Sequence, residues 1–156
     1  TIAWEEQKAI ERAELAAKES RAVSALDGVA SALPALTRAL KLQKRAARIG
    51  FDWPDAAPVM DKIREETAEL QVEMDAGNGP GMVDELGDLL FSVVNLARHL
   101  DIDPEAALRA GNAKFERRFR HLEADLADQG LDPKDLDITA LEAAWKNSKT
   151  HDNSTD

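Results

Sequence analysis

The sequence predicts an all-α protein, an antiparallel helical bundle with four to five main helices. Alanine and leucine are abundant, tyrosine is absent, and glycine and proline mark the boundaries between segments. Apolar residues recur at helical spacing, and no stretch of useful length shows the alternation expected of a strand. A chain of 156 residues is long enough for one domain with a hydrophobic core.

The N-terminal third is predicted to contain two helices. Residues 1–25 form a charged linker helix with little apolar face of its own. A second helix runs from Pro34 to Ile49, because proline suits a first helical turn and Gly50 is a good stop. Residues 51–55 contain a proline and are predicted to form a loop.

The centre of the chain is predicted to form two antiparallel helices. The first spans residues 59–76 and ends in the glycine-rich segment 77–81, which is the clearest break in the sequence. The second spans residues 82–100. Its leucines and valines cover most of its circumference, so we expect this helix to be central and buried.

The C-terminal third is predicted to contain two more helices. Asp103 caps a helix that runs to about Asp128, and its Phe115 and Phe119 should face the core. The last helix begins at Thr139 with a capping-box pattern and reaches about Lys149. Residues 26–150 are therefore expected to form the main helical domain, and residues 151–156 a disordered tail.

The composition limits the possible partners and compartments. A net charge of −10 argues against a nucleic-acid-binding surface, which needs a basic footprint. No apolar run is long enough to span a membrane, and the start carries no signal-peptide pattern. The absence of cysteine excludes disulfides and thiolate metal sites and is compatible with the cytoplasm, where we expect the protein. Because the chain begins with Thr1, we expect it to be a piece of a longer protein.

Two acidic segments each place two carboxylates three residues apart, which puts each pair on one face of a helix. The four residues are Glu66, Glu69, Glu85 and Asp88. Four carboxylates facing one another near an apolar seam would repel strongly unless a cation lay between them. The alternative is an acidic stripe that is simply exposed to solvent. It is less favourable for Glu85 and Asp88, because their helix is otherwise strongly apolar and unpaired carboxylates there are costly.

The ligand type indicates which metal the acidic residues would bind. Carboxylate oxygens without thiolate or imidazole suit Mg²⁺, with Mn²⁺ as a substitute. No histidine stands three residues after a candidate glutamate, which argues against a di-iron bundle. Mg²⁺ held by carboxylates commonly takes phosphate oxygens as its remaining ligands, so the expected substrate is a phosphate ester or anhydride.

Several basic and polar residues are candidates for substrate binding, each with a structural alternative. Lys114 and Arg118 lie four apart and form either a cationic clamp on phosphates or an ordinary basic surface. Lys62 lies four residues before Glu66, where it either contributes to the site or only forms an ordinary salt bridge along the helix. Asn95, on a very apolar helix, needs a hydrogen-bond partner near the metal or on the substrate.

The last helix carries a further candidate pair, Trp145 and Lys149, again four residues apart. The tryptophan is either a buried anchor for the terminal helix or a cover over the substrate site. Glu65 lies about 100° around its helix from Glu66 and is therefore expected to have a role other than inner metal ligand.

Taken together, these residues resemble the MazG family of nucleoside triphosphate pyrophosphohydrolases, in particular its second, C-terminal domain. The resemblance covers about residues 20–149 and implies that residues 26–150 form a MazG-like catalytic domain. It is carried by the segments Gly50–Pro54, Lys62–Glu69, Asp84–Phe91, Val94–Arg98 and Asn112–Phe119. The acidic motifs are shared with the wider all-α pyrophosphatase superfamily, whereas the segment that includes Lys114–Phe119 is more specific to MazG.

The resemblance implies Mg²⁺-dependent hydrolysis of nucleoside triphosphates to a monophosphate and pyrophosphate, as house-cleaning of the nucleotide pool. Four carboxylates would hold the metal, Glu65 would orient or deprotonate the water, and basic and polar residues would bind the triphosphate. The metal ligands are Glu66, Glu69, Glu85 and Asp88, and the residues tied to triphosphate binding and turnover are Lys114, Arg118, Trp145 and Lys149. Lys62 and Glu65 match further positions of the acidic motifs, while Asn95 is a substrate-binding candidate from its own position alone.

The resemblance also implies a homodimer of interlocked helices and an N-terminal MazG domain outside this chain. Alternatives within the superfamily are a dUTP or modified-dNTP pyrophosphatase and a phosphoribosyl-ATP pyrophosphohydrolase. A non-catalytic helical interaction module, whose acidic faces serve a basic partner, is the alternative from another class.

Overall fold

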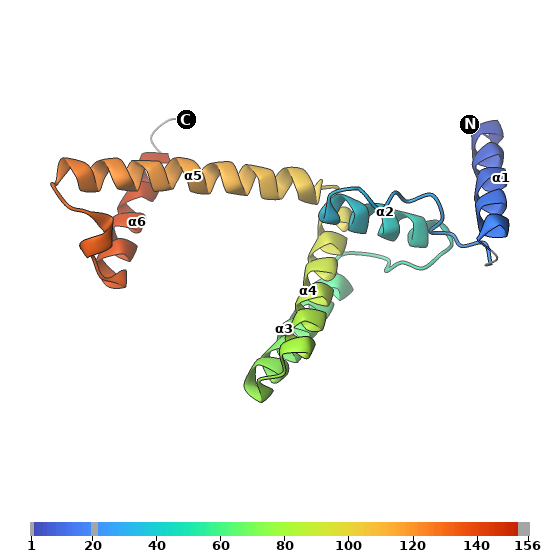
Figure 1. Cartoon of the computed structure of the whole chain (residues 1–156), viewed down its shortest axis with the longest axis horizontal. Helices are drawn as coiled ribbons and strands as arrows, with labels where there is room; N and C mark the ends of the chain where they lie inside the picture. Colours follow the sequence, from blue (N-terminus) through green and yellow to red (C-terminus); the bar gives the residue numbers. More distant parts are fainter. Residues whose placement is uncertain (1, 20–21, 153–156) are drawn as a thin grey trace. The chain divides into compact units, whose positions relative to one another are not determined.

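The computed structural model describes residues 2–19 and 22–152, and the remaining residues lie outside this description. Every regular element in the described ranges is a helix, which confirms the all-α prediction. The elements are α1 (Ile2–Lys18), α2 (Ala35–Arg48), α3 (Ala57–Ala76), α4 (Gly79–His99), α5 (Pro104–Asp128), the short 3₁₀ helix η1 (Pro133–Asp135) and α6 (Ile138–Asp152) (Figure 1). None of the helices in these ranges combines the length and apolar character needed to cross a membrane.

The N-terminal helix is shorter than predicted. It ends at Lys18 instead of residue 25, and residues 22–34 form turns and irregular backbone. The Ser24 backbone N–H donates to Asp27 Oδ2 at 2.9 Å, and Gly28 has a φ of 81°. Serine, aspartate and glycine favour such turns because their side chains or backbone freedom compete with helix formation.

Helix α2 confirms its prediction closely. Pro34 lies at its N-terminal cap position and the helix ends at Arg48. Gly50 follows with a φ of 86°, a left-handed conformation in which glycine carries no steric penalty. The chain then enters the irregular segment 51–56, as the proline there predicts.

Helices α3 and α4 form an antiparallel hairpin and run side by side in Figure 1. The break between them is only Gly77 and Asn78, so the prediction that it extends to Gly81 was wrong. Gly77 has a φ of 65°, and the Asn78 side chain accepts a hydrogen bond from the Gly81 backbone N–H at 3.4 Å. Because Asn78 caps the helix and Pro80 suits a first turn, α4 starts at Gly79. Helix α2 packs against the other end of α4.

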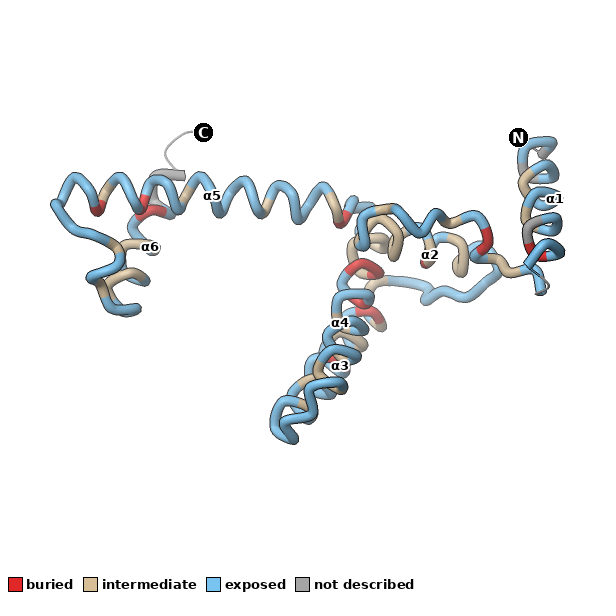
Figure 2. The backbone as a smooth tube through the Cα atoms, viewed as in Figure 1, coloured by how far each residue is buried: buried red, intermediate tan, exposed pale blue. Residues whose placement is uncertain are grey.

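Helix α4 is not buried all round, contrary to the prediction. Its buried residues are Ser92, Val94 and Asn95. A stripe of exposed apolar side chains at spacings of three and four residues, here called the α4 stripe, comprises Val83, Leu86, Leu90 and Val93. Figure 2 shows the helix exposed along much of its length. An apolar face at this spacing predicts burial but does not specify whether its own chain supplies the cover.

Contacts divide the chain into an N-terminal unit ending at Glu105 and a C-terminal unit starting at Ala106, and each is described separately. Leu122, Leu126 and Ser148 are buried in the C-terminal unit. Phe115 stacks on Phe119 with ring centroids 5.8 Å apart. These phenylalanines remain 57% and 40% exposed, so the prediction that they face the core was wrong.

Helix α6 begins and ends at positions other than those predicted. Asp137 Oδ1 accepts a hydrogen bond from the Ala140 backbone N–H at 2.8 Å, so Asp137 rather than Thr139 caps the helix. The helix continues to Asp152, two residues into the segment predicted to be a disordered tail. Residues 153–156 of that predicted tail lie outside the described residues.

Candidate metal and substrate site

Three of the four predicted metal ligands come together on the α3–α4 hairpin. Carboxylate oxygens of Glu66, Glu85 and Asp88 lie within 4.8 Å of one another. The tight reversal at Gly77 and Asn78 makes the helices antiparallel, and the three-residue spacing puts Glu85 and Asp88 on one face of α4. Among the described residues, this is the one group of three or more carboxylates or histidines with such geometry.

The fourth predicted ligand, Glu69, is outside this group of three. It lies one turn after Glu66 on α3 and is exposed. Its negative charge nevertheless acts on Glu85. Partial burial, followed by the charges of Glu69 and Glu66, raises the pKa of the Glu85 carboxyl above its ordinary value of 4.5. A cation bound among these groups would remove that repulsion.

Lys62 forms salt bridges with both adjacent glutamates of the first acidic segment, Glu65 and Glu66. Its Nζ lies 2.6 Å from Glu66 Oε1 and 2.9 Å from Glu65 Oε1. The hydrogen bond to Glu66, with that to Glu65, raises the pKa of Lys62 and keeps it protonated. The Glu65 side chain is 56% exposed and that of Glu66 is 4% exposed. The two adjacent glutamates therefore occupy different environments, as their helical phase predicts.

The second oxygen of Glu66 is the clearest sign that this group of carboxylates needs a cation. Glu66 Oε2 is buried and accepts no hydrogen bond from any described group. A buried charged oxygen without a partner is costly, since it loses water and gains nothing in return. Hard carboxylate oxygens from three residues match the ligands of Mg²⁺ and related cations. The donor set thus fits a divalent metal ion.

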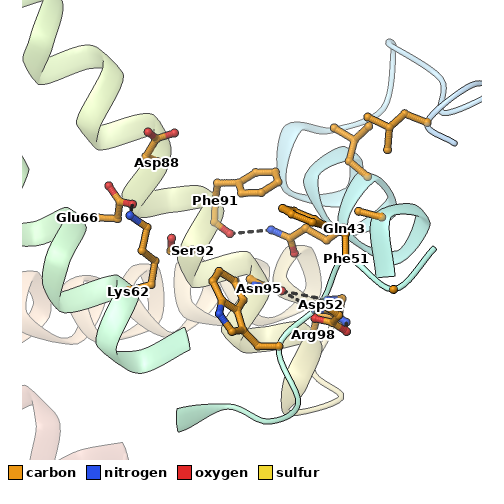
Figure 3. A pocket seen from close by; sticks show the side chains of 15 residues that line it. Gln43, Phe51, Asp52, Lys62, Glu66, Asp88, Phe91, Ser92, Asn95 and Arg98 are labelled. Atoms are coloured by element: carbon orange, nitrogen blue, oxygen red, sulfur yellow. Dashed lines mark hydrogen bonds and ion pairs between the residues drawn. The ribbon is translucent and has the colours of Figure 1, made fainter. Parts of the chain in front are cut away.

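A cavity of about 730 Å³ adjoins the carboxylates. It lies between α2, the segment 49–56 and α4, with Lys62, Glu66 and Asp88 lining one part of it. The rest of its wall is mostly apolar and includes three aromatic residues, Phe51, Trp53 and Phe91. Figure 3 shows the Lys62 ammonium group beside Glu66 and the Phe51 and Phe91 rings close to Gln43. This volume suits a small-molecule ligand.

Asn95, predicted as a substrate-binding residue, lines the same cavity and is held by Arg98. The Asn95 Oδ1 accepts hydrogen bonds from Arg98 Nε at 3.1 Å and Arg98 Nη2 at 2.8 Å. Arg98 Nη1 donates to Asp52 Oδ2 at 2.8 Å, and Arg98 Nη2 donates to Asp52 Oδ1. These bonds lower the pKa of Asp52 below its ordinary value of 3.8. The network fastens the segment after α2 onto α4.

Three polar residues of this region were not among the predicted site residues: Gln43, Asp52 and Arg98. Gln43 is 7% exposed, and its Nε2 donates to the Phe91 carbonyl at 2.8 Å. A signal for Gln43 was present, because it lies on the same side of α2 as Leu36 and Leu40 and so interrupts an apolar face. Asp52 and Arg98 are 46 residues apart, and no local spacing connects them.

The remaining predicted site residues belong to the C-terminal unit and are described there by themselves. Lys114 and Lys149 are exposed, and Arg118 is partly exposed. The Trp145 ring lies 5.3 Å from that of Phe115, centroid to centroid, which joins α6 to α5. This contact agrees with the structural alternative, an anchor for the last helix. Roles for these four residues at the acidic site stay predictions.

Comparison with known proteins agrees with the resemblance. Residues 56–123, which include the whole carboxylate cluster, match the family model of the MazG nucleotide pyrophosphohydrolase domain. A nucleoside triphosphate pyrophosphohydrolase of Escherichia coli strain K12 is 45% identical over 148 residues, which are 94% of this chain and 54% of that protein.

Two further relatives extend the comparison to other bacteria. The Thermotoga maritima nucleoside triphosphate pyrophosphohydrolase/pyrophosphatase MazG is 38% identical over 96% of this chain and 55% of its own length. The uncharacterized protein YabN of Bacillus subtilis is 40% identical over 94% of this chain and 29% of its own. This chain thus spans about half the length of the first two relatives. Residues 56–123 thus match the MazG nucleotide pyrophosphohydrolase domain, and the chain as a whole is similar to nucleoside triphosphate pyrophosphohydrolases that carry the MazG name or activity.

Proposed function

We propose that this chain hydrolyses nucleoside triphosphates between the α and β phosphates and releases a nucleoside monophosphate and pyrophosphate. The observation that carries the proposal is the cluster of Glu66, Glu85 and Asp88, where one buried carboxylate oxygen has no partner. The names of the Escherichia coli and Thermotoga maritima relatives support this reaction class. The reaction would remove unwanted triphosphates from the nucleotide pool of the cytoplasm.

Mg²⁺ is the cation we assign to the cluster, with Mn²⁺ as a substitute. Glu66, Glu85 and Asp88 would hold it, and Glu69, one turn from Glu66, is the fourth candidate ligand. When bound there, the ion would neutralise charge on phosphate oxygens and lower the pKa of a water molecule.

The chain's own residues prepare and complete the reaction. Lys62 holds Glu66 in position and offsets part of the negative charge that would otherwise repel a triphosphate. Glu65, which is more exposed than Glu66, accepts a proton from the attacking water. As the water oxygen bonds to phosphorus, the bond to the pyrophosphate oxygen breaks and pyrophosphate leaves with its electron pair.

The C-terminal unit is proposed to contribute cationic groups for the leaving pyrophosphate. Lys114 would act as a point charge, and Arg118 would present a forked donor to two oxygens. Lys149 and Trp145 are the further candidates for substrate binding. The support for these four roles is their match to MazG positions, since the structure describes their unit separately.

An assay with product identification tests the proposal. The chain is incubated with a panel of NTPs and dNTPs, dUTP and phosphoribosyl-ATP included, with and without Mg²⁺. Pyrophosphate and monophosphate are expected only with the metal, whereas orthophosphate and diphosphate would overturn the reaction assigned here. Glu66→Gln should abolish turnover. Glu73→Gln, two turns further along α3, is the matched control because its amide oxygen can still accept from Asn78. Activity that survives Glu66→Gln would remove the metal assignment.

We further propose that the α4 stripe is covered by a second copy of this chain. Four apolar side chains, each 45–74% exposed, follow one helix face over three turns. A two-fold axis across such a face would pair the stripe with itself, so one surface supplies both halves of the interface. The resemblance to a family of helical dimers supports this assignment. The other predicted partner, an N-terminal MazG domain outside the chain, stays a prediction.

A further inference from the structure

Two buried amide side chains line the cavity, and their hydrogen bonds leave one of them an acceptor and the other a donor. Gln43 on α2 is 7% exposed and Asn95 on α4 is 6% exposed. Both belong to the wall of the 730 Å³ cavity, whose other lining includes Glu66 and Asp88 of the carboxylate cluster (Figure 3).

The orientation of the Gln43 amide is set by its partner. Its Nε2 donates to the backbone carbonyl of Phe91 at 2.8 Å, and a carbonyl can only accept. The amide therefore cannot be turned round without placing two oxygens against each other. Its Oε1 is left as a buried acceptor with no hydrogen-bond partner among the described groups. Such an atom is expected to have a partner in the working protein.

The Asn95 amide is fixed in the opposite sense. Its Oδ1 accepts two hydrogen bonds from the Arg98 guanidinium, which can only donate. Asp52 in turn holds Arg98 through a paired contact. The Asn95 Nδ2 is thus committed as a donor, and none of the hydrogen bonds between described residues uses it. The cavity wall offers one acceptor and one donor, together with the apolar faces of aromatic residues.

We propose that this cavity is the nucleobase site, in which a base N–H donates to Gln43 Oε1 and a ring nitrogen or carbonyl accepts from Asn95 Nδ2. The inference rests on the proposed function, because it assigns the carboxylate end of the cavity to the triphosphate. Each standard base carries an N–H group next to an acceptor on its pairing edge. The site therefore accepts both amino and keto bases and discriminates against analogues that lack the N–H group. Phe51 and Trp53 supply surface on which any base can stack.

The first experiment compares ATP with purine riboside triphosphate, which keeps the ring acceptors and lacks the exocyclic amine. The loss of one hydrogen bond should raise KM about five- to tenfold in the wild-type chain. In Gln43→Met the two KM values should converge, because the acceptor is gone. The control is Gln71→Met, an exposed glutamine on α3 outside the cavity, which should retain the wild-type ratio.

Inorganic tripolyphosphate separates base recognition from a general loss of structure. As an inhibitor it fills the metal end without a base, so Gln43→Met should leave its inhibition constant unchanged. An equal loss for ATP and tripolyphosphate would show that Gln43 only joins α2 to α4, which overturns the proposal. An unchanged preference for ATP over the purine analogue in Gln43→Met would overturn it as well.

A second variant covers the case in which Gln43→Met fails to fold. Phe51 is 79% exposed, so Phe51→Ala removes little packing, yet it should raise KM for ATP several-fold without affecting tripolyphosphate. If no triphosphate is cleaved at all, the proposed function fails alone. Calorimetry with uncleavable α,β-methylene-ATP then still tests the base site, where weaker binding to Phe51→Ala supports it and equal affinity refutes it.

Discussion

Truncating the α4 stripe should dissociate the proposed dimer without unfolding the chain. Leu86 and Leu90 are 47% and 51% exposed in the single chain, so about half of each side chain remains to be buried. Full burial of a leucine contributes about 1.5–3 kcal/mol, and the remaining half therefore about 1 kcal/mol. In a two-fold symmetric dimer each residue counts twice, which gives about 4 kcal/mol for the pair.

A free-energy loss of that size corresponds to a rise in the dimer Kd of about a thousandfold. Sedimentation velocity over the micromolar range should show wild-type dimers and Leu86→Ala/Leu90→Ala monomers, while circular dichroism shows equal helix content. The control is Ile138→Ala, because Ile138 is 71% exposed on α6 and lies outside the stripe. A wild-type chain that stays monomeric at every concentration, or a control that dissociates equally, would refute the reasoning.

Three further outcomes follow from individual residues. Mg²⁺ at a hundred times its Kd should stabilise the wild-type fold by about 2.7 kcal/mol and raise Tm by about 5–10 °C. Thermal melting should show the same rise in the control variant Glu73→Gln and no rise in Glu66→Gln. A rise in both variants would contradict the assignment of Glu66 as a metal ligand. Since the pKa of Asp52 is lowered on folding, its stabilising contribution is present above its ordinary pKa of 3.8 and is lost as pH falls through the lowered value. The Tm difference between wild type and Asp52→Asn should therefore shrink as pH falls below 4, and a constant difference would contradict this. Gly77→Ala forces alanine to a φ of 65° and should cost about 1 kcal/mol, whereas Gly111→Ala, in the open interior of α5, should be neutral or stabilising in the same melts.

Local rules predicted much of the fold because they depend on neighbours in the chain. Pro34 and Gly50 bound α2, and helical spacing together with the turn at Gly77 brings the acidic segments to one place. The predicted starts of α4 and α6 were wrong because side-chain caps at Asn78 and Asp137 decide where those helices begin.

Contacts between distant segments are what the sequence could not supply. The Asp52–Arg98 pair joins groups 46 residues apart, and the Gln43 contact with Phe91 spans 48 residues. Amphipathic spacing also cannot identify the surface that covers an apolar face. For that reason the prediction that α4 is buried failed, although its pattern of apolar residues was read correctly.

The two-residue reversal between α3 and α4 makes the spacing of the carboxylates sensitive to chain length in one place. Glu66 and Glu85 are only 19 residues apart, so their site can assemble within a single hairpin at a small entropic cost of closure. A residue inserted within α4 between Asn78 and Glu85 would turn the acidic face by about 100° relative to the capped start of the helix. The metal site therefore constrains the length of this hairpin as strictly as it constrains the glutamates, whereas most other positions of the hairpin tolerate substitution.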